Sequence, residues 1–459
     1  MGRCAARVAG ADVTPAVRRI AAVVVLGALL SMLDATVVAV GLETMARDLG
    51  VDLAAAQWIA HSYLLALAVA LPACGWLGRR VGTGRLWLVA LAGFTLASVL
   101  CAAAPTLGLL VAARALQGVA AGFLVPSGQA LLGQAVGPER LGRVMALLGA
   151  VVSLGPALGP VVGGVLLEVA SWPWLFLINL PLGVVGMVAG LRVLPRGTPA
   201  RPGPLDVPGL LLAGIGLSVL VYGLTVRAPL PMVAGAVLLV LFVVRTRRRP
   251  SPLTDLRLFA ERRYALATLC STLTGASLFG TVLVFPLLLQ LARGTGPVGT
   301  GLSLLSYGLA TAASTPLAGR LTDRMGGGRV AVAGCVGLML TAIPFALWTP
   351  GPVLLQVLLV LRGVAIGFAA IPPTVAAYAA VRPESLPDAT TQLNALQRVG
   401  GAIGGALVAT VLATLLPAGP AAAFTAVFWL LAGLAAVALV PAVLLARRPA
   451  PEPTPRERR

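Results

Sequence analysis

The sequence contains no lysine, a single histidine and only 15 acidic residues among its 459. Charged residues make up 11% of the chain and hydrophobic residues 58%, whereas a soluble domain carries about 25% charged residues. Apolar runs of about 20 residues, the length that crosses a hydrocarbon core, recur along the whole chain. This shortage of charge excludes a soluble globular protein and predicts an all-α membrane protein that crosses the bilayer many times.

The scarcity of ligating side chains excludes several kinds of site. The cysteines lack the spacing of a disulfide framework or a metal cage, and we expect free thiols at Cys4, Cys74, Cys101, Cys270 and Cys335. One histidine leaves no second ligand for a metal ion, and the absence of lysine excludes a P-loop nucleotide site. We therefore expect no cofactor and no metal.

The net charge of +19 comes entirely from arginine. A chain this basic can bind nucleic acid, but these arginines stand at intervals in short segments between apolar runs, as the positive-inside rule describes. We therefore expect the lipid bilayer as the partner and no nucleic acid. Abundant alanine, glycine and proline together with the lack of lysine suggest a GC-rich bacterial genome, and hence the bacterial cytoplasmic membrane.

Fourteen apolar segments are candidates for membrane spans. We place them near residues 20–42, 56–78, 86–104, 107–130, 144–167, 173–193, 207–225, 230–244, 264–291, 298–319, 330–348, 353–380, 390–416 and 421–446. Arginines gather in alternate loops, while the opposite loops keep only Arg47, Arg227 and Arg293. This asymmetry predicts that both termini are cytoplasmic, and an odd number of spans would break the alternation.

An internal repeat organises the chain. GWLGRRVGTGRLWL at 75–88 matches GRLTDRMGGGRVAV at 319–332, and two further matches, 118–126 with 363–372 and 154–164 with 399–409, keep the same offset of about 245 residues. The repeat predicts two six-helix bundles in pseudo-twofold parallel arrangement, with two extra helices between them. The expected division is a tail at 1–19, a first bundle at 20–193, a linker with two helices at 194–263, a second bundle at 264–446 and a tail at 447–459.

Several segments also follow the order and spacing of a known transporter family. LDATVVAVGLETM, which begins at Leu33, is similar to a first-helix signature, and RALQGVAAG, which begins at Arg114, to a fourth-helix signature. GPALGPVVGG at 155–164 is similar to an antiporter motif of the fifth helix, and SWPWLFLINLPLG at 171–183 to the link into the sixth. Over essentially its whole length the chain resembles the major facilitator superfamily, specifically its fourteen-helix multidrug:proton antiporter branch.

The resemblance implies a secondary active transporter and not an enzyme. Such a protein exports drugs or other amphipathic or cationic organic compounds across the membrane in exchange for protons, by alternating access. Its partners would be a small organic substrate and protons, and we expect a monomer. Ala39, Glu43 and Arg79 depart from the residues usual in this branch. Two alternatives stay open: an uptake or metabolite facilitator of the same fold, and a non-transport membrane enzyme or sensor.

Three ionisable residues within predicted spans are candidates for proton coupling. Asp34 lies in the first span, where a carboxylate costs about 2.5–3.5 kcal/mol, and burial favours its protonated form. Arg114 needs a partner at membrane depth, and we expect it to face Asp34. His61 is a candidate relay, because histidine is the residue type that changes charge most readily at physiological pH. The alternatives are an acid used only for packing, an arginine bonded to carbonyl groups and a packed histidine.

Two motifs are expected to move or seal the helices. The antiporter motif, Gly155, Pro156, Gly159, Pro160, Gly163 and Gly164, should bend the fifth span and let it approach the other bundle closely. The loop motif and its repeat should form a latch between the bundles on the cytoplasmic side. The alternative is that their charges only fix the orientation of the protein in the membrane. The residues are Gly75, Arg79, Arg80, Gly82, Arg85, Gly319, Asp323, Arg324, Gly326 and Arg329.

A further set of polar or aromatic residues in predicted spans could line a central cleft. Each could instead form a hydrogen bond between packed helices. They are Thr36, Tyr63, Gln117, Gln129, Gln290, Tyr307, Arg362, Asn394 and Gln397.

Overall fold

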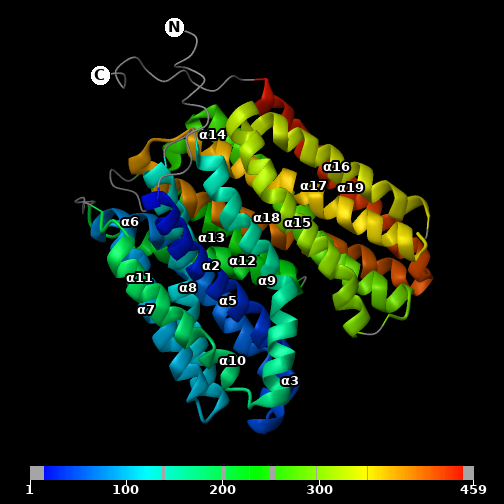
Figure 1. Cartoon of the computed structure of the whole chain (residues 1–459), viewed down its shortest axis with the longest axis horizontal. Coiled ribbons are helices and arrows are strands. Elements are labelled where there is room, and N and C mark those ends of the chain that lie inside the picture. The colour runs from blue at the N-terminus through cyan, green and yellow to red at the C-terminus, as the bar shows by residue number, and fades with distance from the viewer. Residues whose placement is uncertain are drawn as a thin grey trace.

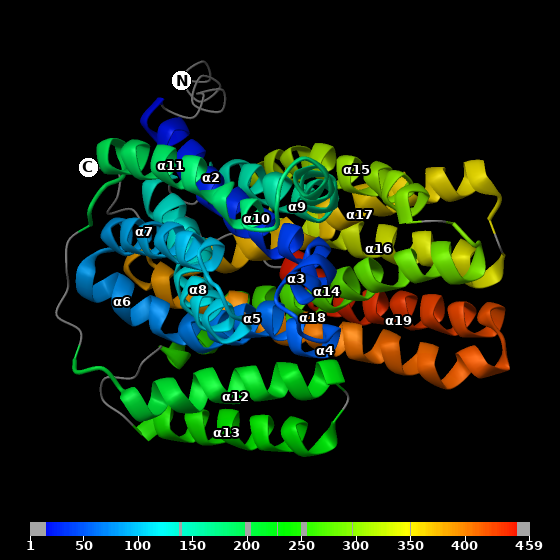
Figure 2. The same cartoon turned by 90° about the horizontal axis from the view of Figure 1, so that it is seen from below.

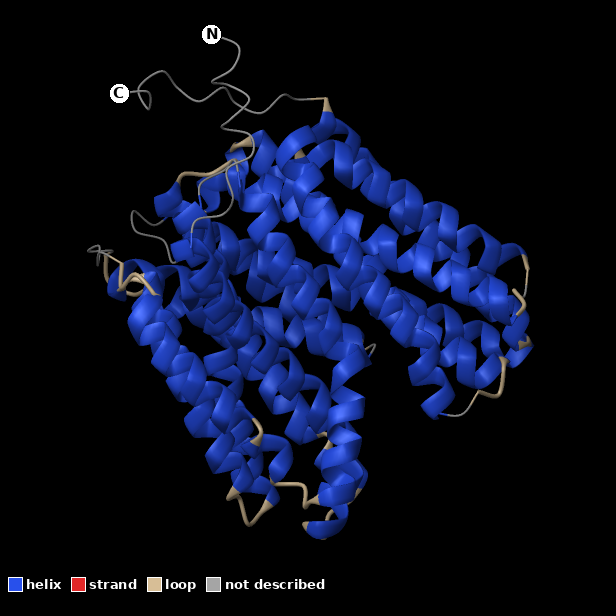
Figure 3. Cartoon of the chain, viewed as in Figure 1, coloured by secondary structure: helices blue, strands red, loops and turns tan. Residues whose placement is uncertain are grey.

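The computed structural model describes residues 15–136, 140–197, 203–226, 228–248, 255–295, 297–348 and 350–447. This part of the chain is almost entirely helical and contains no strand (Figure 3). Most of the two predicted tails lies outside the described residues, as do Cys4 and Arg227.

The helices fall into two groups separated by a helical pair. The first helix group contains α2 (Pro15–Val40), α3 (Leu42–Asp48), α4 (Leu53–Ala56), α5 (Trp58–Ala70), η1 (Leu71–Ala73), α6 (Cys74–Val81), α7 (Thr83–Ala102), α8 (Leu107–Val136), α9 (Leu141–Val169), α10 (Trp174–Leu177) and α11 (Asn179–Val193). The pair is α12 (Val207–Val226) and α13 (Pro229–Arg248). The second helix group contains η3 (Leu256–Ala260), α14 (Arg262–Leu287), η4 (Leu288–Ala292), α15 (Pro297–Met325), α16 (Gly327–Leu347), α17 (Pro352–Ala379), η5 (Pro383–Ser385), α18 (Leu386–Leu415), η6 (Leu416–Ala418) and α19 (Pro420–Ala446).

Twelve helices of the described residues are long and apolar enough to cross a membrane. This finding confirms the prediction of an all-α, multi-pass membrane protein. Two more helices, α9 and α15, are each 29 residues long but are not among these twelve. The predicted count of fourteen spans therefore stays a prediction.

The repeated loop motif forms the same turn twice. Gly82 lies between α6 and α7 with a φ of 91°, and Gly326 lies between α15 and α16 with a φ of 84°. Side chains other than hydrogen disfavour this region of backbone space, so glycine is required at both corners. The 244-residue offset seen in the sequence thus corresponds to a shared local geometry.

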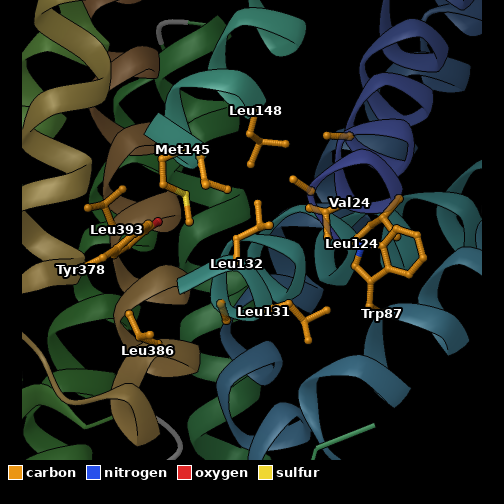
Figure 4. Close-up of a cluster of buried hydrophobic side chains, with 14 of the residues drawn as sticks. Val24, Trp87, Leu124, Leu131, Leu132, Met145, Leu148, Tyr378, Leu386 and Leu393 are labelled. Atoms are coloured by element: carbon orange, nitrogen blue, oxygen red, sulfur yellow. The ribbon is translucent and has the colours of Figure 1, made fainter. Parts of the chain in front are cut away.

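The two helix groups meet on one side and diverge on the other. Figure 1 shows them together where α2 begins and α19 ends, which we call the basal side, and apart at the opposite end, which we call the distal side. A hydrophobic cluster joins the groups on the basal side: Leu132 and Met145 of the first group pack with Tyr378 and Leu393 of the second (Figure 4). Burial of these side chains excludes water from the basal interface.

Charged groups reinforce the basal contact. Arg79 of α6 forms an ion pair with Asp388 of α18. Asp323 of α15 accepts hydrogen bonds from the backbone N–H groups of Gly142 at 2.8 Å and Arg143 at 3.1 Å, at the start of α9. Each carboxylate therefore joins one helix group to the other.

The helical pair lies along one edge of the molecule (Figure 2). α12 contacts both α5 of the first group and α18 of the second. On the α5 side, Ser218 donates a hydrogen bond to the carbonyl of Leu65 at 3.1 Å, and Gly214 packs on the backbone of Val69. α12 consequently covers the seam between the two groups on that edge.

Candidate functional site

The candidate site is built around a carboxylate buried inside the first helix group. Asp34 of α2 has a fully buried side chain, and its Oδ2 accepts a hydrogen bond from Arg114 Nη1 of α8 at 2.6 Å. Its Oδ1 accepts hydrogen bonds from Gln117 Nε2 and Asn179 Nδ2, both at 2.9 Å. The expected contact between Asp34 and Arg114 is present, and the acid satisfies its lone pairs with one cation and two amides.

Arg114 has other acceptors besides the acid. Its Nε donates to the carbonyl of Ile59 at 3.2 Å, and its Nη1 also donates to Gln117 Oε1 at 2.6 Å. Its guanidinium carbon lies 4.3 Å from the centre of the Tyr63 ring and 5.7 Å from that of Phe176. Two ring faces and two neutral acceptors therefore stabilise this cation independently of Asp34.

Two amide side chains complete the network. Gln117 was expected in the cleft, but it is fully buried beside Asp34 and also donates to Ser98 Oγ at 2.8 Å. Asn179 donates to Ser98 Oγ at 3.2 Å, while its own Oδ1 is buried without a donor. Because five hydrogen bonds from α8 and α11 converge on Asp34 of α2 and Ser98 of α7, rotation of one helix changes the environment of the acid.

Tyr63 lies between this network and the second helix group. Its hydroxyl is 3.2 Å from Ser31 Oγ, and its ring covers the Arg114 guanidinium. Its side chain also lies near Arg398 of α18. Tyr63, which was expected in the cleft, therefore separates the buried ion pair from a cation of the other group.

His61 lies outside this network. Its ring packs edge-on against Trp58, with 6.1 Å between ring centres. Trp58 is about half exposed, at 48%, so the pair sits at the distal end of α5 near the surface. His61 makes no contact with Asp34 in this conformation, so its role as a relay stays a prediction.

The described part of the antiporter motif contacts a different helix from the one expected. A side chain at Gly159 would collide with Thr36 of α2, and one at Gly163 would lie 3.2 Å from the carbonyl of Val37. Both contacts are within the first helix group, so the prediction that these glycines approach the other bundle is wrong. The reason is that they lie on the face of α9 that packs on α2. Gly164 faces open space, and the side chains of Gly155, Pro156 and Pro160 are outside the described residues.

Another face of α9 makes the close approach to the second group. Gly142 packs against Gly319 and Asp323 of α15, and Gly149 against Ile371 of α17. These small residues let the helix backbones come together on the basal side. The prediction assigned the close approach to the antiporter motif at 155–164, whereas Gly142 and Gly149, earlier in the same helix, make it.

Two of the expected cleft residues, Gln129 and Asn394, form a polar floor between the groups. Gln129 Oε1 of α8 accepts from Tyr378 Oη at 3.0 Å and from Asn394 Nδ2 at 2.6 Å. Gln397, one turn further along α18, instead donates to Ser271 Oγ within the second group at 2.6 Å. Polar contact across the interface therefore passes through Gln129 and Asn394.

The other expected cleft residues lie apart from the floor. Thr36 bonds to backbone carbonyls of its own helix, and Gln290 is exposed at the distal end in η4. Tyr307 has a buried hydroxyl without a partner. Arg362 is fully buried and donates to Thr281 Oγ1 at 2.7 Å; it is enclosed within the second group.

Arg362 also shows how a cation survives without an acid in this fold. It donates to the carbonyl of Leu338 at 3.2 Å, and its guanidinium carbon lies 5.8 Å from the Phe285 ring centre. No ion pair is formed by Arg362 with any residue in the described ranges. Neutral acceptors and a ring face replace the carboxylate that Arg114 has.

Some residues of the loop motif contact the other helix group, and others do not. Arg79 and Asp323 make the contacts between groups described above, and Gly75 packs against Asp388. Arg80 instead lies over the Trp76 ring, 5.2 Å from its centre. Arg79 thus joins the two groups although an acid is usual at its position in the resembled family.

Sequence reasoning did not select three side chains that the structure places in or beside this network. Ser98, Asn179 and Arg398 are polar or charged residues deep in predicted spans, which is the signal that identified Asp34 and Arg114. Among the described residues, no group of three His, Cys, Asp or Glu side chains could hold a metal ion.

The sequence matches one family model and many known proteins. The model for the Major Facilitator Superfamily matches residues 24–405 and 267–459. The multidrug resistance protein B homolog of Mycobacterium tuberculosis is 35% identical over 403 residues, which cover 84% of this chain and 74% of the relative. The uncharacterized MFS-type transporter YcnB of Bacillus subtilis is 30% identical over 395 residues, which cover 84% of both proteins.

Solved structures show the same fold at low sequence identity. The human organic anion transporter MFSD10 (TETRAN) superposes with a TM-score of 0.68 at 20% identity, covering 94% of this chain and 100% of that one. The proton:xylose symporter XylE superposes with a TM-score of 0.64 at 13% identity, covering 92% of this chain and 94% of the other.

Proposed function

Because this chain belongs to the Major Facilitator Superfamily, we propose that it is a proton-coupled exporter of amphipathic organic compounds in the bacterial cytoplasmic membrane. The multidrug resistance relative supports export of drug-like compounds. We further propose that α9 and α15 complete fourteen spans and that the two helix groups are six-helix bundles with the boundaries predicted above. The chain would act as a monomer with no cofactor.

The basal side is proposed to face the cytoplasm. The arginine-rich loops support this orientation. The Arg79–Asp388 pair and the Asp323 contacts would then hold the cytoplasmic side closed, while the distal side opens outward. Transport would alternate between this conformation and one in which the basal contacts are broken.

The observation that carries the proton-coupling proposal is the buried Asp34–Arg114 pair. A proton on Asp34 Oδ2 would replace the hydrogen bond from Arg114 Nη1. Arg114 would keep its bonds to Ile59 and Gln117 and its contacts with two rings. The second bundle has no acid equivalent to Asp34, since the repeat places Leu278 there, so coupling would belong to the first bundle.

Protonation would also change the amides around the acid. Asn179 Oδ1 is a buried acceptor without a donor, and rotation of this amide would present it to a protonated carboxyl group. Breaking a buried ion pair costs about 3–5 kcal/mol when no partner replaces the lost charge. A switch in helix packing that supplies new partners would therefore accompany each change of protonation state.

The energy source would be the proton gradient and the membrane potential. One elementary charge that crosses the membrane gains about 2.3 kcal/mol per 100 mV. Compound would leave the outward-facing cleft before Asp34 is protonated, and the proton would be released on the cytoplasmic side. A facilitator of the same fold would need no such acid.

The decisive experiment compares Asp34→Asn with wild type in proteoliposomes under an imposed pH gradient. The substrates are fluorescent amphipathic compounds of negative, zero and positive charge. We expect Asp34→Asn to lose proton-driven flux, whereas Glu43→Gln, at an exposed pair on α3, keeps it. Proton-driven flux in Asp34→Asn equal to wild type would overturn the coupling role, and flux that follows only the substrate gradient would favour a facilitator.

A second variant separates coupling from folding. Asp34→Asn leaves Arg114 as a buried cation and can lower stability by several kcal/mol. The double variant Asp34→Asn/Arg114→Gln removes both charges, so we expect its thermal unfolding temperature to recover toward wild type. Its proton-driven flux should remain absent.

A further inference from the structure

One arginine of the second helix group has no hydrogen-bond or ion-pair partner among the residues that the structure describes. Arg398 lies near the middle of α18 and is only partly buried. It donates no hydrogen bond to, and forms no ion pair with, any residue that the structure describes. A cation at membrane depth normally has such partners, as Arg114 and Arg362 do.

The neighbours of Arg398 on α18 show which way it faces. Asn394, four residues earlier and therefore on the same helix face, bonds to Gln129 of the first group at 2.6 Å. Arg398 itself lies near Tyr63 of the first group. Its guanidinium thus lies between the two groups, one turn on the distal side of the floor formed by Gln129 and Asn394.

The same face of α18 is open on its distal side. A side chain built at Gly405, two turns beyond Arg398, would meet nothing within 4 Å, and the groups diverge in this direction (Figure 1). Arg398 therefore lies between the two groups, one turn from the Gln129–Asn394 contact on the side where the groups diverge.

No acidic residue that the structure describes forms an ion pair with Arg398. Asp34 is already paired with Arg114. From residue 255 to residue 447 the acidic residues are all near the basal ends of helices: Asp255, Glu261, Asp323, Glu384 and Asp388. Among the described residues, Arg398 therefore keeps an unpaired positive charge and unbonded guanidinium N–H donors.

We propose that Arg398 binds the oxyanion of the transported compound, which is an amphipathic organic anion with a carboxylate, sulfonate or phosphate group. A guanidinium matches such groups because its N–H donors form two parallel hydrogen bonds. In this proposal the apolar body of the compound would lie between the two groups on the distal side of Arg398. This inference rests on the proposed export function, and it replaces a cationic substrate with an anionic one.

Three naphthalene compounds of nearly equal size provide the test: 1-naphthaleneacetate, its neutral amide and the cationic 1-(1-naphthyl)ethylamine. Binding to the purified full-length protein in detergent and proton-driven flux in proteoliposomes are measured for each. We expect the carboxylate to bind more tightly than the amide by about 10- to 100-fold, the effect of a hydrogen bond to a charged group.

The variants identify the source of this preference. Arg398→Gln should lower carboxylate affinity by the same factor and leave amide affinity within about twofold, whereas Arg398→Lys should retain part of the preference. Arg47→Gln removes a positive charge from an exposed distal pair and should change neither. Because Arg398 has no partner to lose, its variants should elute as wild type does in gel filtration.

Each outcome decides the matter. Proton-driven flux of the three compounds without preference for the carboxylate overturns the inference but keeps the export function. An equal loss of amide and carboxylate flux in Arg398→Gln shows that the residue serves coupling, and also overturns it. Absence of proton-driven flux for all three compounds overturns the export function and the inference together.

Discussion

Arg79 and Asp388 are 309 residues apart in the chain, yet they form an ion pair that joins α6 to α18. Asp388 is almost completely buried, and its Oδ1 has no donor. The pair is therefore held together by one oxygen of the carboxylate and by the packing of Gly75 against Asp388. A contact of this kind stabilises the closed basal side without making it permanent.

We predict that Asp388→Asn opens the basal side more often. The substitution removes the ion pair between buried Asp388 and partly exposed Arg79. Loss of such a pair costs about 1–3 kcal/mol. Ala146 is fully buried against Gly319 at this interface, so Ala146→Cys reports opening through its rate of reaction with a thiol reagent. We expect that rate to rise about tenfold or more in Asp388→Asn, in line with this energy.

The matched control is Glu384→Gln. Glu384 is exposed in η5, one turn from Asp388, and removal of its charge should leave the rate unchanged. Equal rates in Asp388→Asn and wild type would show that the hydrophobic cluster alone closes the basal side.

The fold was largely predictable from the sequence, because apolar length and arginine spacing depend on the membrane and not on the partners of each side chain. The contact of Asp34 with Arg114 was also predictable, since two opposite charges in neighbouring apolar spans have few other solutions. The prediction that Gln117 lines the cleft was wrong. A polar residue in a span can face a cleft or bond to a buried acid, and the sequence pattern is the same in both cases.

The contacts of α9 could not be predicted for a geometric reason. Each residue turns a helix by about 100°, so Gly149 and Gly159 point to different neighbours although both belong to one glycine-rich span. Sequence shows that the helix has small residues but not which neighbour each one meets. Arg398 was missed for a related reason: whether an arginine in a span is paired depends on the rotation of the helix that carries it.

The contact between Gly159 and Thr36 predicts a specific loss of function. Gly159→Leu should push α9 away from α2, and overpacking of this kind costs about 1–3 kcal/mol. Thr36 is two residues from Asp34, so displacement of α2 should also disturb the bond to Arg114. We expect a lower thermal unfolding temperature and a large loss of proton-driven flux in proteoliposomes.

Gly164→Leu is the matched control for that substitution. Gly164 belongs to the same motif on the same helix, but a side chain there would meet nothing within 4 Å. It should insert, unfold and transport as wild type does. If the two substitutions had equal effects, any added side chain in this motif would impair the protein, and the contact of Gly159 with α2 would not be the cause.

The charge of the substrate predicts how transport depends on the membrane potential. Exchange of one proton for one monovalent anion moves two charges inward, so a potential of 100 mV, negative inside, contributes about 4.6 kcal/mol and an accumulation ratio of about 2000. A neutral compound gains about 2.3 kcal/mol, a ratio of about 50, and exchange of a monovalent cation gains nothing. A potassium diffusion potential set with valinomycin, at equal pH on both sides of the proteoliposome membrane, measures these ratios.

We expect 1-naphthaleneacetate to respond more steeply than its amide in wild type, and neither to respond in Asp34→Asn because no proton then moves. Equal responses of the carboxylate and the amide in wild type would mean that the compound crosses in one charge state, and that Arg398 does not carry an anion through the cycle.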